Sequence, residues 1–458
     1  METIVKAIDN FNFLKLVSFK DFTLWDVKRL VAERIASDFP IVTLGDYIKE
    51  ENTKIRPAQE PEKEHKILGV NNIDGIFDAY TQLGKEIKQP YKVMNEGFLA
   101  YNPYRINVGS IGLKSKEHQN DLISPAYVVF SCKKGLIPDF LYKLFKTERF
   151  NKVIRDNTTG SVRQNLTIDI LRTLEIPLPK PTEQEEILAD YNAKMQEAER
   201  LKVEIEATKQ VFQDVIFDEL ALNRPKQYEY TFGLQFVNFK DLVTWNFRQI
   251  SEDEQLKSKK YPVTSIEKYP ELAVSVFRGK NPKYQDDTEA IILNQKCNRW
   301  NAIELEHAKT VNPKWLASLS EIDFTKEGDI LINSTGEGTI GRATTITKEF
   351  AGLMYDTHML LLRLNKEKVN PEFFTYLFNS SYGQKQVDSI KSAQSTKQTE
   401  LGVGNLKKIH FPLPTLEEQI LVVDKLKQLE ERQREIENEM KNLPDQAIKD
   451  FEAKIFKN

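Results

Sequence analysis

The chain has 458 residues, of which 40% are hydrophobic and 29% charged, and its formal net charge is −3. This composition indicates a folded protein of roughly two to four domains and excludes a disordered chain. Two cysteines, Cys132 and Cys297, are too few for a disulfide framework and make a cysteine-based zinc site improbable. No apolar run reaches the roughly 20 residues of a membrane span, and no export signal is evident. We therefore expect a cytoplasmic protein that does not bind a membrane.

Strand-like and helix-like segments are mixed irregularly in residues 1–180 and again in 223–414. The first stretch contains a strand at 127–130 and a helix at 140–153. The second contains strands at 291–293, 329–332 and 358–362 and a helix at 373–390. Strands and helices without a regular βαβ order predict an α+β fold.

A long helix is predicted after each of these stretches, at 181–222 and at 415–458. Both follow a Pro-Leu-Pro sequence, and the pairs Thr182/Glu185 and Thr415/Glu418 have the spacing of a capping box. A 3.5-residue period then predicts a coiled-coil seam, the alternative being ordinary amphipathic helices on globular domains. We expect 182–220 and 415–443 to pack antiparallel, with a break or kink at Pro444. The expected partner-binding positions are Gln184, Ile187, Tyr191, Leu201, Ile205, Gln419, Val422, Leu426, Leu429 and Ile436.

Several motifs occur twice, at a spacing that rises from 220 to 235 residues along the chain. A diverged duplication with small loop insertions produces such a drift. The matching segments are 14–25 with 234–245, 109–112 with 338–341, 138–140 with 371–373, 176–179 with 411–414, and Gln184 with Gln419. We therefore predict two similar domains, 1–180 and 223–414, separated by long antiparallel coiled-coil helices at 181–222 and 415–458.

No motif argues for catalysis. Residues 336–341 spell G-x-G-x-x-G, but the following segment reads as a strand, whereas a dinucleotide site requires a helix there. Asn102-Pro103-Tyr104 lacks the second proline of an amino-methyltransferase motif. The five histidines show no metal-ligand spacing, so we expect neither a metal nor a cofactor in this chain.

Loops rich in hydrogen-bond donors are the remaining candidates for function. Residues 100–163 hold 11 Lys and Arg but 5 Asp and Glu, which gives a local basic surface. Arg and Lys pair with guanine, Asn and Gln with adenine, and Ser, Thr and Lys with phosphates. The candidate DNA-binding residues are Arg105, Asn107, Lys114, Lys116, Ser161, Arg163, Gln164, Arg278, Lys280, Lys296, Arg299, Thr335, Arg342, Lys397 and Gln398.

The doubled domain endings carry a resemblance to a known family. One ending runs from 160–166 through Ile176-Pro177-Leu178-Pro179 to 183–187, and the other runs from 395–401 through Phe411-Pro412-Leu413-Pro414 to 417–420. With the segments 102–112 and 124–127, these endings resemble the specificity subunit of type I restriction-modification systems over nearly the whole chain.

The resemblance implies two target-recognition domains related by a pseudo-twofold axis, each reading one half of a split, asymmetric site on double-stranded DNA. It implies two methyltransferase subunits and restriction/translocase subunits as partners. Adenine methylation, S-adenosylmethionine, ATP and Mg would belong to those partners. Two alternatives remain open: a coiled-coil scaffold that binds only protein, and the recognition part of a fused restriction-modification enzyme.

Overall fold

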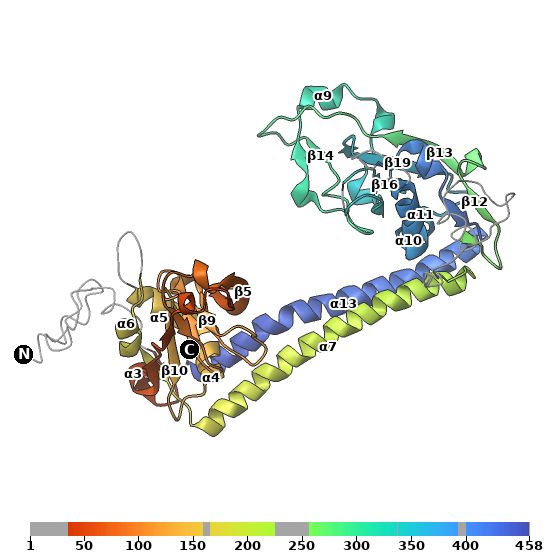
Figure 1. Cartoon of the computed structure of the whole chain (residues 1–458). Coiled ribbons are helices and arrows are strands. Elements are labelled where there is room, and N and C mark those ends of the chain that lie inside the picture. The colour runs from red at the N-terminus through yellow and green to blue at the C-terminus, as the bar shows by residue number, and fades with distance from the viewer. Residues whose placement is uncertain (1–34, 159–164, 225–255, 337, 393–399, 458) are drawn as a thin grey trace, which may run out of the picture. The chain divides into compact units, whose positions relative to one another are not determined.

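The computed structural model describes residues 35–158, 165–224, 256–336, 338–392 and 400–457 (Figure 1). The chain divides into two units by its internal contacts. Unit 1 comprises Met1–Lys202 and Asn438–Asn458, and unit 2 comprises Val203–Glu437. Each unit therefore combines one α+β domain with part of both long helices. The repeated 14–25 and 234–245 segments lie outside the described residues.

Unit 1 is built on a four-stranded antiparallel sheet with the strand order β2-β10-β7-β8. A second sheet has the order β3-β6-β9-β4-β5, in which only β4 and β9 run parallel, and β1 pairs with β11. The strands are β1 (Ile41–Thr43), β2 (Ile48–Glu50), β3 (Lys54–Ile55), β4 (Glu64–Val70), β5 (Ile76–Leu83), β6 (Tyr91–Val93), β7 (Leu99–Tyr101), β8 (Ile111–Leu113), β9 (Leu122–Ile123), β10 (Val128–Cys132) and β11 (Glu175–Pro177).

Short amphipathic helices complete this domain. They are α3 (Leu44–Tyr47), α4 (Pro138–Lys146), α5 (Glu148–Asn157) and α6 (Ile168–Thr173). Helix α4 starts with proline at its first turn and buries Phe140, Leu141, Leu144 and Phe145. The Thr147 hydroxyl caps α5 by accepting the amide of Phe150. These helices form one apolar core with the inward-facing residues of the four-stranded sheet.

Unit 2 has the same plan. Its four-stranded antiparallel sheet has the order β13-β19-β16-β17, a smaller sheet has the order β15-β14-β18, and β12 pairs with β20. The strands are β12 (Val263–Ser265), β13 (Ala273–Arg278), β14 (Ile291–Leu293), β15 (Lys309–Thr310), β16 (Ile330–Asn333), β17 (Ala343–Thr345), β18 (Met354–Tyr355), β19 (Met359–Leu364) and β20 (His410–Pro412). The helices of the domain are α9 (Pro313–Ala317), α10 (Pro371–Asn379), α11 (Ser381–Ser392) and α12 (Val403–Lys407).

The strand registers confirm the duplication and correct one part of its alignment. Ala100 pairs with Val129 in unit 1 as Leu331 pairs with Leu361 in unit 2. Along the next strand pair, Ile111 corresponds to Ala343. The preceding Gly109 therefore matches Gly341, and both have a φ of 83°. The match of 109–112 with 338–341 was wrong by three residues, because two glycine turns of similar sequence lie close together in the second copy.

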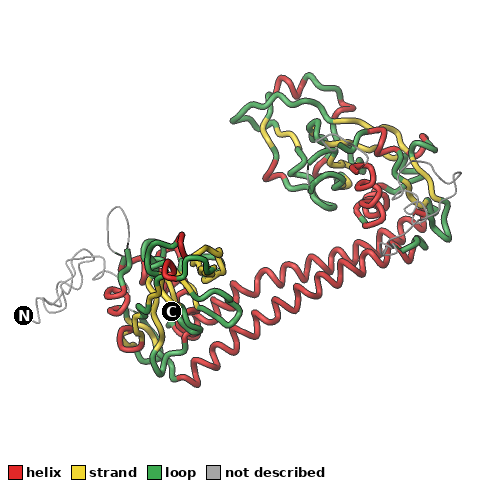
Figure 2. The backbone as a smooth tube through the Cα atoms, viewed as in Figure 1, coloured by secondary structure: helices red, strands yellow, loops and turns green. Residues whose placement is uncertain are grey.

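The two long helices are α7 (Pro181–Glu219) and α13 (Leu416–Ile455), drawn with all helices in Figure 2. In unit 1, Lys194 of α7 pairs with Asp450 of α13 at 3.0 Å, and Asp190 pairs with Lys454. In unit 2, Glu219 pairs with Lys425 at 2.6 Å and Glu204 pairs with Arg432 at 3.6 Å. As the residue numbers increase along α7, the residue numbers of their partners on α13 decrease. The helices therefore pack antiparallel in each unit, as predicted.

The long helices differ from the prediction in two details. Pro444 does not interrupt α13, which continues to Ile455, and Ala447 and Phe451 in the following turns are buried. The capping box is complete at Thr415 and Glu418. In α7, however, the reciprocal Thr182/Glu185 pair does not form. Instead, the amide of Lys180 donates to Glu183 at 2.7 Å, because the helix already begins at Pro181.

Candidate nucleic-acid interface

In unit 2, several predicted DNA-binding residues meet at one end of the four-stranded sheet. Arg278 is the last residue of β13 and donates to the carbonyl of Thr357 at 2.9 Å. Its guanidinium also pairs with Glu400 at 2.5 Å. The hydroxyl of Thr335, just after β16, lies 2.8 Å from Nδ1 of His358. Arg278 and Thr335 therefore lie at the ends of β13 and β16, the two strands that flank β19.

The loop after β14 lies against the same strand ends. The buried amide nitrogen of Asn298 donates to Asn333 and to the carbonyl of Arg342, at 3.0 Å in each case. The Arg342 guanidinium lies 5.9 Å from the ring centre of the exposed Trp300. Arg342 also donates to the carbonyl of Gly338 at 3.0 Å. Asn298 therefore fixes the 294–303 loop to the 334–342 loop, and an arginine and an indole lie together at the surface.

Three of the predicted cations of this region, Arg278, Lys280 and Arg299, already have carboxylate partners. Arg299 pairs with Glu304 at 2.7 Å, and Lys280 pairs with Asp323 at 3.3 Å. Lys296 is exposed in the same loop as Arg299. Solvent-exposed ion pairs contribute only about 0–1 kcal/mol, so such cations can exchange a carboxylate for a phosphate at low cost.

Unit 1 supports part of the predicted set. Arg105 is exposed at the end of the loop after β7, and no described carboxylate pairs with it. Asn107 is half-buried in the 3₁₀ turn Ile106–Val108. Lys116 is exposed after β8 and lies 3.8 Å from Glu96.

Lys114 is not available to DNA. Its side chain is only 6% exposed, and its ammonium donates to the carbonyl of Met94 at 2.8 Å and pairs with Asp121. The strand registers show that Lys114 is equivalent to the buried Ile346 of unit 2. Lys114 was predicted to bind DNA because its segment is basic, but it occupies a core position of the fold. The predictions for Ser161, Arg163, Gln164, Lys397 and Gln398 lie outside the described residues.

One loop of unit 1 beside these residues was not predicted from the sequence. Residues 71–75 connect β4 and β5, and Lys146 donates to the carbonyls of Asn72 at 3.3 Å and Gly109 at 3.1 Å. Burial and the nearby Lys143 lower the pKa of Lys146. This loop corresponds to the 294–303 loop of unit 2, since each follows the first strand of the parallel pair in its sheet, β4 with β9 and β14 with β18. The Asn-Asn-Ile-Asp-Gly turn between two strand-like runs was the available signal.

The predicted partner-binding residues mostly face the chain itself. Gln184 is fully buried, accepts the amide of Ile137 at 2.9 Å and donates to the carbonyls of Gly135 and Pro179. Gln419 repeats this arrangement with Asn370, Lys368 and Pro414. Both glutamines hold the start of a long helix on its own domain, so their assignment to a partner surface was wrong.

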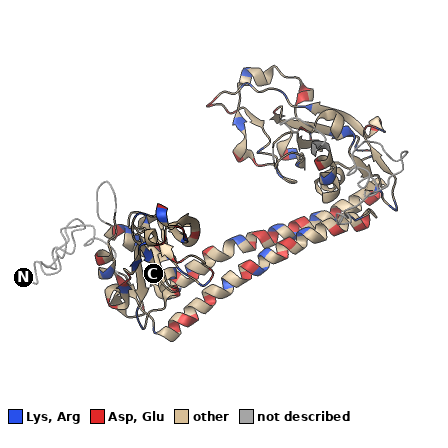
Figure 3. Cartoon of the chain, in the orientation of Figure 1, with Lys and Arg blue, Asp and Glu red and all other residues tan. Residues whose placement is uncertain are grey.

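The apolar seam positions are likewise covered within the chain. Ile187 belongs to the core of unit 1, and Tyr191 packs against Phe451 with ring centres 6.2 Å apart. Val422 and Leu426 belong to the core of unit 2. Leu201, Ile205 and Ile436 are buried, and Leu429 is half-buried. The outer faces of α7 and α13 are polar and carry charges of both signs (Figure 3).

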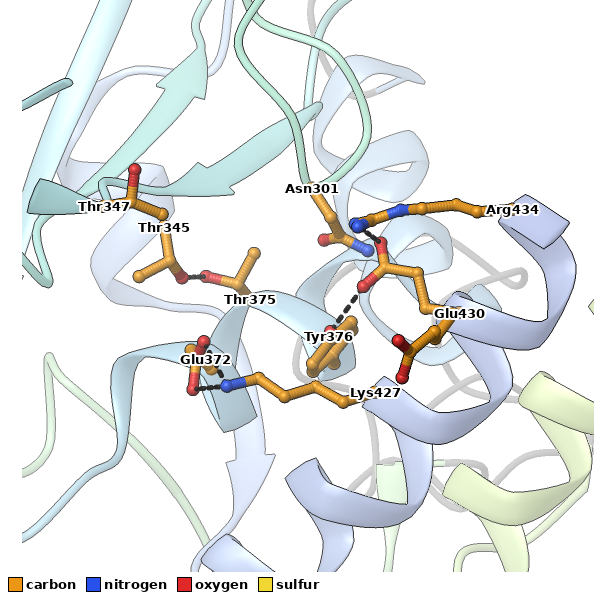
Figure 4. Close-up of a pocket in the computed structure, with 10 residues that line it drawn as sticks. Asn301, Thr345, Thr347, Glu372, Thr375, Tyr376, Lys427, Glu430 and Arg434 are labelled. Atoms are coloured by element: carbon orange, nitrogen blue, oxygen red, sulfur yellow. Dashed lines mark hydrogen bonds and ion pairs between the residues drawn. The ribbon is translucent and has the colours of Figure 1, made fainter. Parts of the chain in front are cut away.

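A polar pocket in unit 2 lies between α10, β17 and α13 (Figure 4). Lys427 pairs with Glu372 at 2.7 Å, and the Tyr376 hydroxyl donates to Glu430 at 2.7 Å. Burial raises the pKa of Tyr376. These contacts fasten α13 to α10.

One candidate metal-binding group lies in the part of the chain that the structure describes. The cluster of possible metal ligands found there is Glu304, Glu306 and His307 at the surface. The Arg299 guanidinium lies 2.8 Å from His307 and pairs with Glu304, so a cation already occupies this cluster. No described helix is long and apolar enough to cross a membrane.

Comparisons with known proteins agree with this architecture. The family model described as type I restriction modification DNA specificity domain matches residues 85–207 and 233–443. The type I restriction enzyme MjaVIII specificity subunit of Methanocaldococcus jannaschii is 22% identical over 429 residues, 88% of each chain. The MjaIX specificity subunit of the same organism is 32% identical over 114 residues, 21% of this chain and 26% of the relative.

One solved chain, from a study of complex assembly and conformational transition of the type I R-M system, is similar in fold. It has a TM-score of 0.54 and 16% identity, and the match covers 92% of this chain and 100% of that one.

Proposed function

Because this chain belongs to the type I restriction-modification specificity subunits, we propose that it binds a bipartite, asymmetric site on double-stranded DNA, one half-site to each α+β domain. The observation that carries the proposal is the convergence of Arg278, Thr335 and Arg342 at one end of a sheet. The corresponding end of the other domain carries Arg105. Two copies of one frame with different loops suit two different half-sites.

The same proposal assigns catalysis to other subunits. Two methyltransferase subunits and the restriction/translocase subunits would dock on the outer faces of α7 and α13 in the cytoplasm. Adenine methylation with S-adenosylmethionine, and ATP- and Mg-dependent cleavage, would occur in those subunits.

Methylation mapping tests this function. The chain is co-expressed with the methyltransferase subunit with which it co-purifies, and the modified sites are sequenced. Arg278→Ala is expected to weaken binding by about 1–3 kcal/mol and to relax one half-site only, if the guanidinium contacts a base. Lys368→Ala, which removes an exposed ion pair with Glu271 near the opposite end of β13, is the matched control. Absence of salt-dependent DNA binding and of a bipartite methylated site would favour the protein-only scaffold instead.

The helix pair also makes a prediction about the spacer between half-sites. Because Lys194 faces Asp450, a heptad inserted after Ala198 requires a second heptad after Asp445 to keep the seam in register. Each insertion adds about 10 Å of helix at ~1.5 Å per residue. This corresponds to at most about three base pairs at 3.4 Å each. We expect a longer spacer with unchanged half-sites in the methylome. An unchanged spacer with full activity would contradict a role of the helices in spacing.

A further inference from the structure

The DNA-facing end of unit 1 carries an unusual apolar surface. Ile73, Tyr104 and Val108 are 84%, 58% and 59% exposed. They lie on two loops in direct contact, because Lys146 bridges the carbonyls of Asn72 and Gly109 and the Ser110 hydroxyl lies 3.3 Å from the carbonyl of Val70. We refer to Ile73, Tyr104 and Val108 as the apolar tip.

The corresponding surface of unit 2 is chemically different. Tyr104 of unit 1 is equivalent to Thr335 of unit 2. The strand registers show this, as do the matching hydrogen bonds of Leu166 to Pro103 and of Leu401 to Ser334. The loop that replaces residues 71–75 carries Arg299 and Trp300, and Arg342 lies over the indole. At these positions unit 2 thus presents guanidiniums, a threonine hydroxyl and an indole, where unit 1 presents aliphatic carbon and a phenol ring.

The two kinds of surface suit different chemical groups on the edges of base pairs. Guanine and adenine are read through hydrogen bonds, whereas thymine alone offers an apolar group, its C5-methyl, in the major groove. Exposed aliphatic side chains cannot pair with O6, N7 or N4, but they gain by covering a methyl group. Arg105, next to Tyr104, supplies a cation for the adjoining phosphates.

We propose that the apolar tip reads thymine methyl groups in the half-site of unit 1, while the polar loops of unit 2 read hydrogen-bonding edges. This inference rests on the proposed function and adds to it the residues and the chemical group that distinguish the two half-sites. Lys146 is a positioning residue in this arrangement, since it holds the two loops of the apolar tip together.

The test replaces thymine by uracil, which lacks only the methyl group. Once the methylated site is known, duplexes carry uracil in one half-site at a time, and binding of the full chain with its methyltransferase subunits is measured. For the native chain, uracil in one half-site is expected to weaken binding about fourfold per contacted methyl, equivalent to about 0.8 kcal/mol. Ile73→Asn/Val108→Asn is expected to bind thymine DNA more weakly and to show no further loss on uracil DNA.

Val274→Asn is the matched control, because Val274 is 67% exposed on the other domain, at the opposite end of β13 from Arg278. It is expected to keep the full sensitivity to uracil. The inference is overturned if uracil weakens binding equally in the native chain and in the apolar-tip variant. It is also overturned if uracil has no effect on binding in either half-site. In those cases a methylated bipartite site still upholds the proposed function. If no such site exists, the proposed function fails first, and the inference falls with it.

Variants that lose assembly with the methyltransferase subunits but retain uracil sensitivity would assign the apolar tip to a protein contact, and this outcome also overturns the inference. The uracil substitution on the native chain requires no mutation, so the proposal stays testable if a variant fails to fold.

Discussion

The two α+β domains share a frame but differ at the loops and at several interior positions. In both, a four-stranded sheet of the same order packs on a helix that begins with proline, and a buried glutamine holds the following long helix in place. The loops at one end carry aliphatic side chains in unit 1 and guanidiniums with threonine in unit 2. The duplication has therefore kept what positions the loops and changed what the loops present.

The interiors also differ in their use of charge. Unit 2 buries Asp329, which is 2% exposed on its side chain, against Arg363 with contacts of 2.7 and 2.6 Å. In unit 1 the position of Arg363 is taken by Ser131, which donates to Glu51 at 2.7 Å. The frame thus tolerates either a buried ion pair or a hydroxyl at one place in the sheet.

The largest effect is expected from breaking the buried ion pair. Arg363→Met leaves the Asp329 carboxylate buried without its partner, which costs about 3–5 kcal/mol in the unfolding of unit 2. Ser131→Ala removes one hydrogen bond from unit 1 and costs about 1 kcal/mol. Hydrogen exchange of the full chain, resolved by segment, measures each unit separately. Equal effects in the two units would show that the ion pair adds nothing to the frame.

The glutamines test whether the frame is the same in both copies. Gln184→Leu and Gln419→Leu each leave one amide and two carbonyls without their partner, at a cost of about 1–3 kcal/mol. We expect similar losses of protection, the first in unit 1 and the second in unit 2. Gln210→Leu, at an exposed position of α7, is the control. Clearly unequal losses of protection would mean that the two glutamines do not stabilise their domains in the same way.

The smallest effect concerns pH. Burial raises the pKa of Asp356, whose carboxylate accepts the amide of His358, whereas Ser124 holds the same turn in unit 1. A raised folded-state pKa means that the folded chain binds a proton more readily than the unfolded chain. This contribution therefore favours folding at low pH and declines as pH rises through the carboxyl range. Asp356→Ser should make the free energy of unfolding of unit 2 depend less on pH than it does in the native chain. An unchanged curve would contradict this assignment.

The sequence predicted the large features because each has a periodic or repeated signal. Two α+β domains, two long antiparallel helices and the capping box at Thr415 follow from the duplication and from helical spacing. The site was predicted less well because charge alone does not report burial. Lys114 replaces a core isoleucine, and Gln184 and Gln419 satisfy backbone groups from distant segments. Ile73 and Val108 were missed because an exposed aliphatic side chain resembles a core residue until the fold is known.

Synthesis of the chain places the two domains in different situations. The core of unit 2 uses Val422, Val423 and Leu426, which follow its domain directly. The core of unit 1 includes Phe451, Ile455 and Phe456, and Glu452 caps α5 by accepting the amide of Glu148. At 5–20 residues per second, about 300 residues separate α5 from this cover, a delay of roughly 15–60 s. The first domain to leave the ribosome thus waits longest for its last apolar contacts, and these residues of its core stay exposed to solvent during that time.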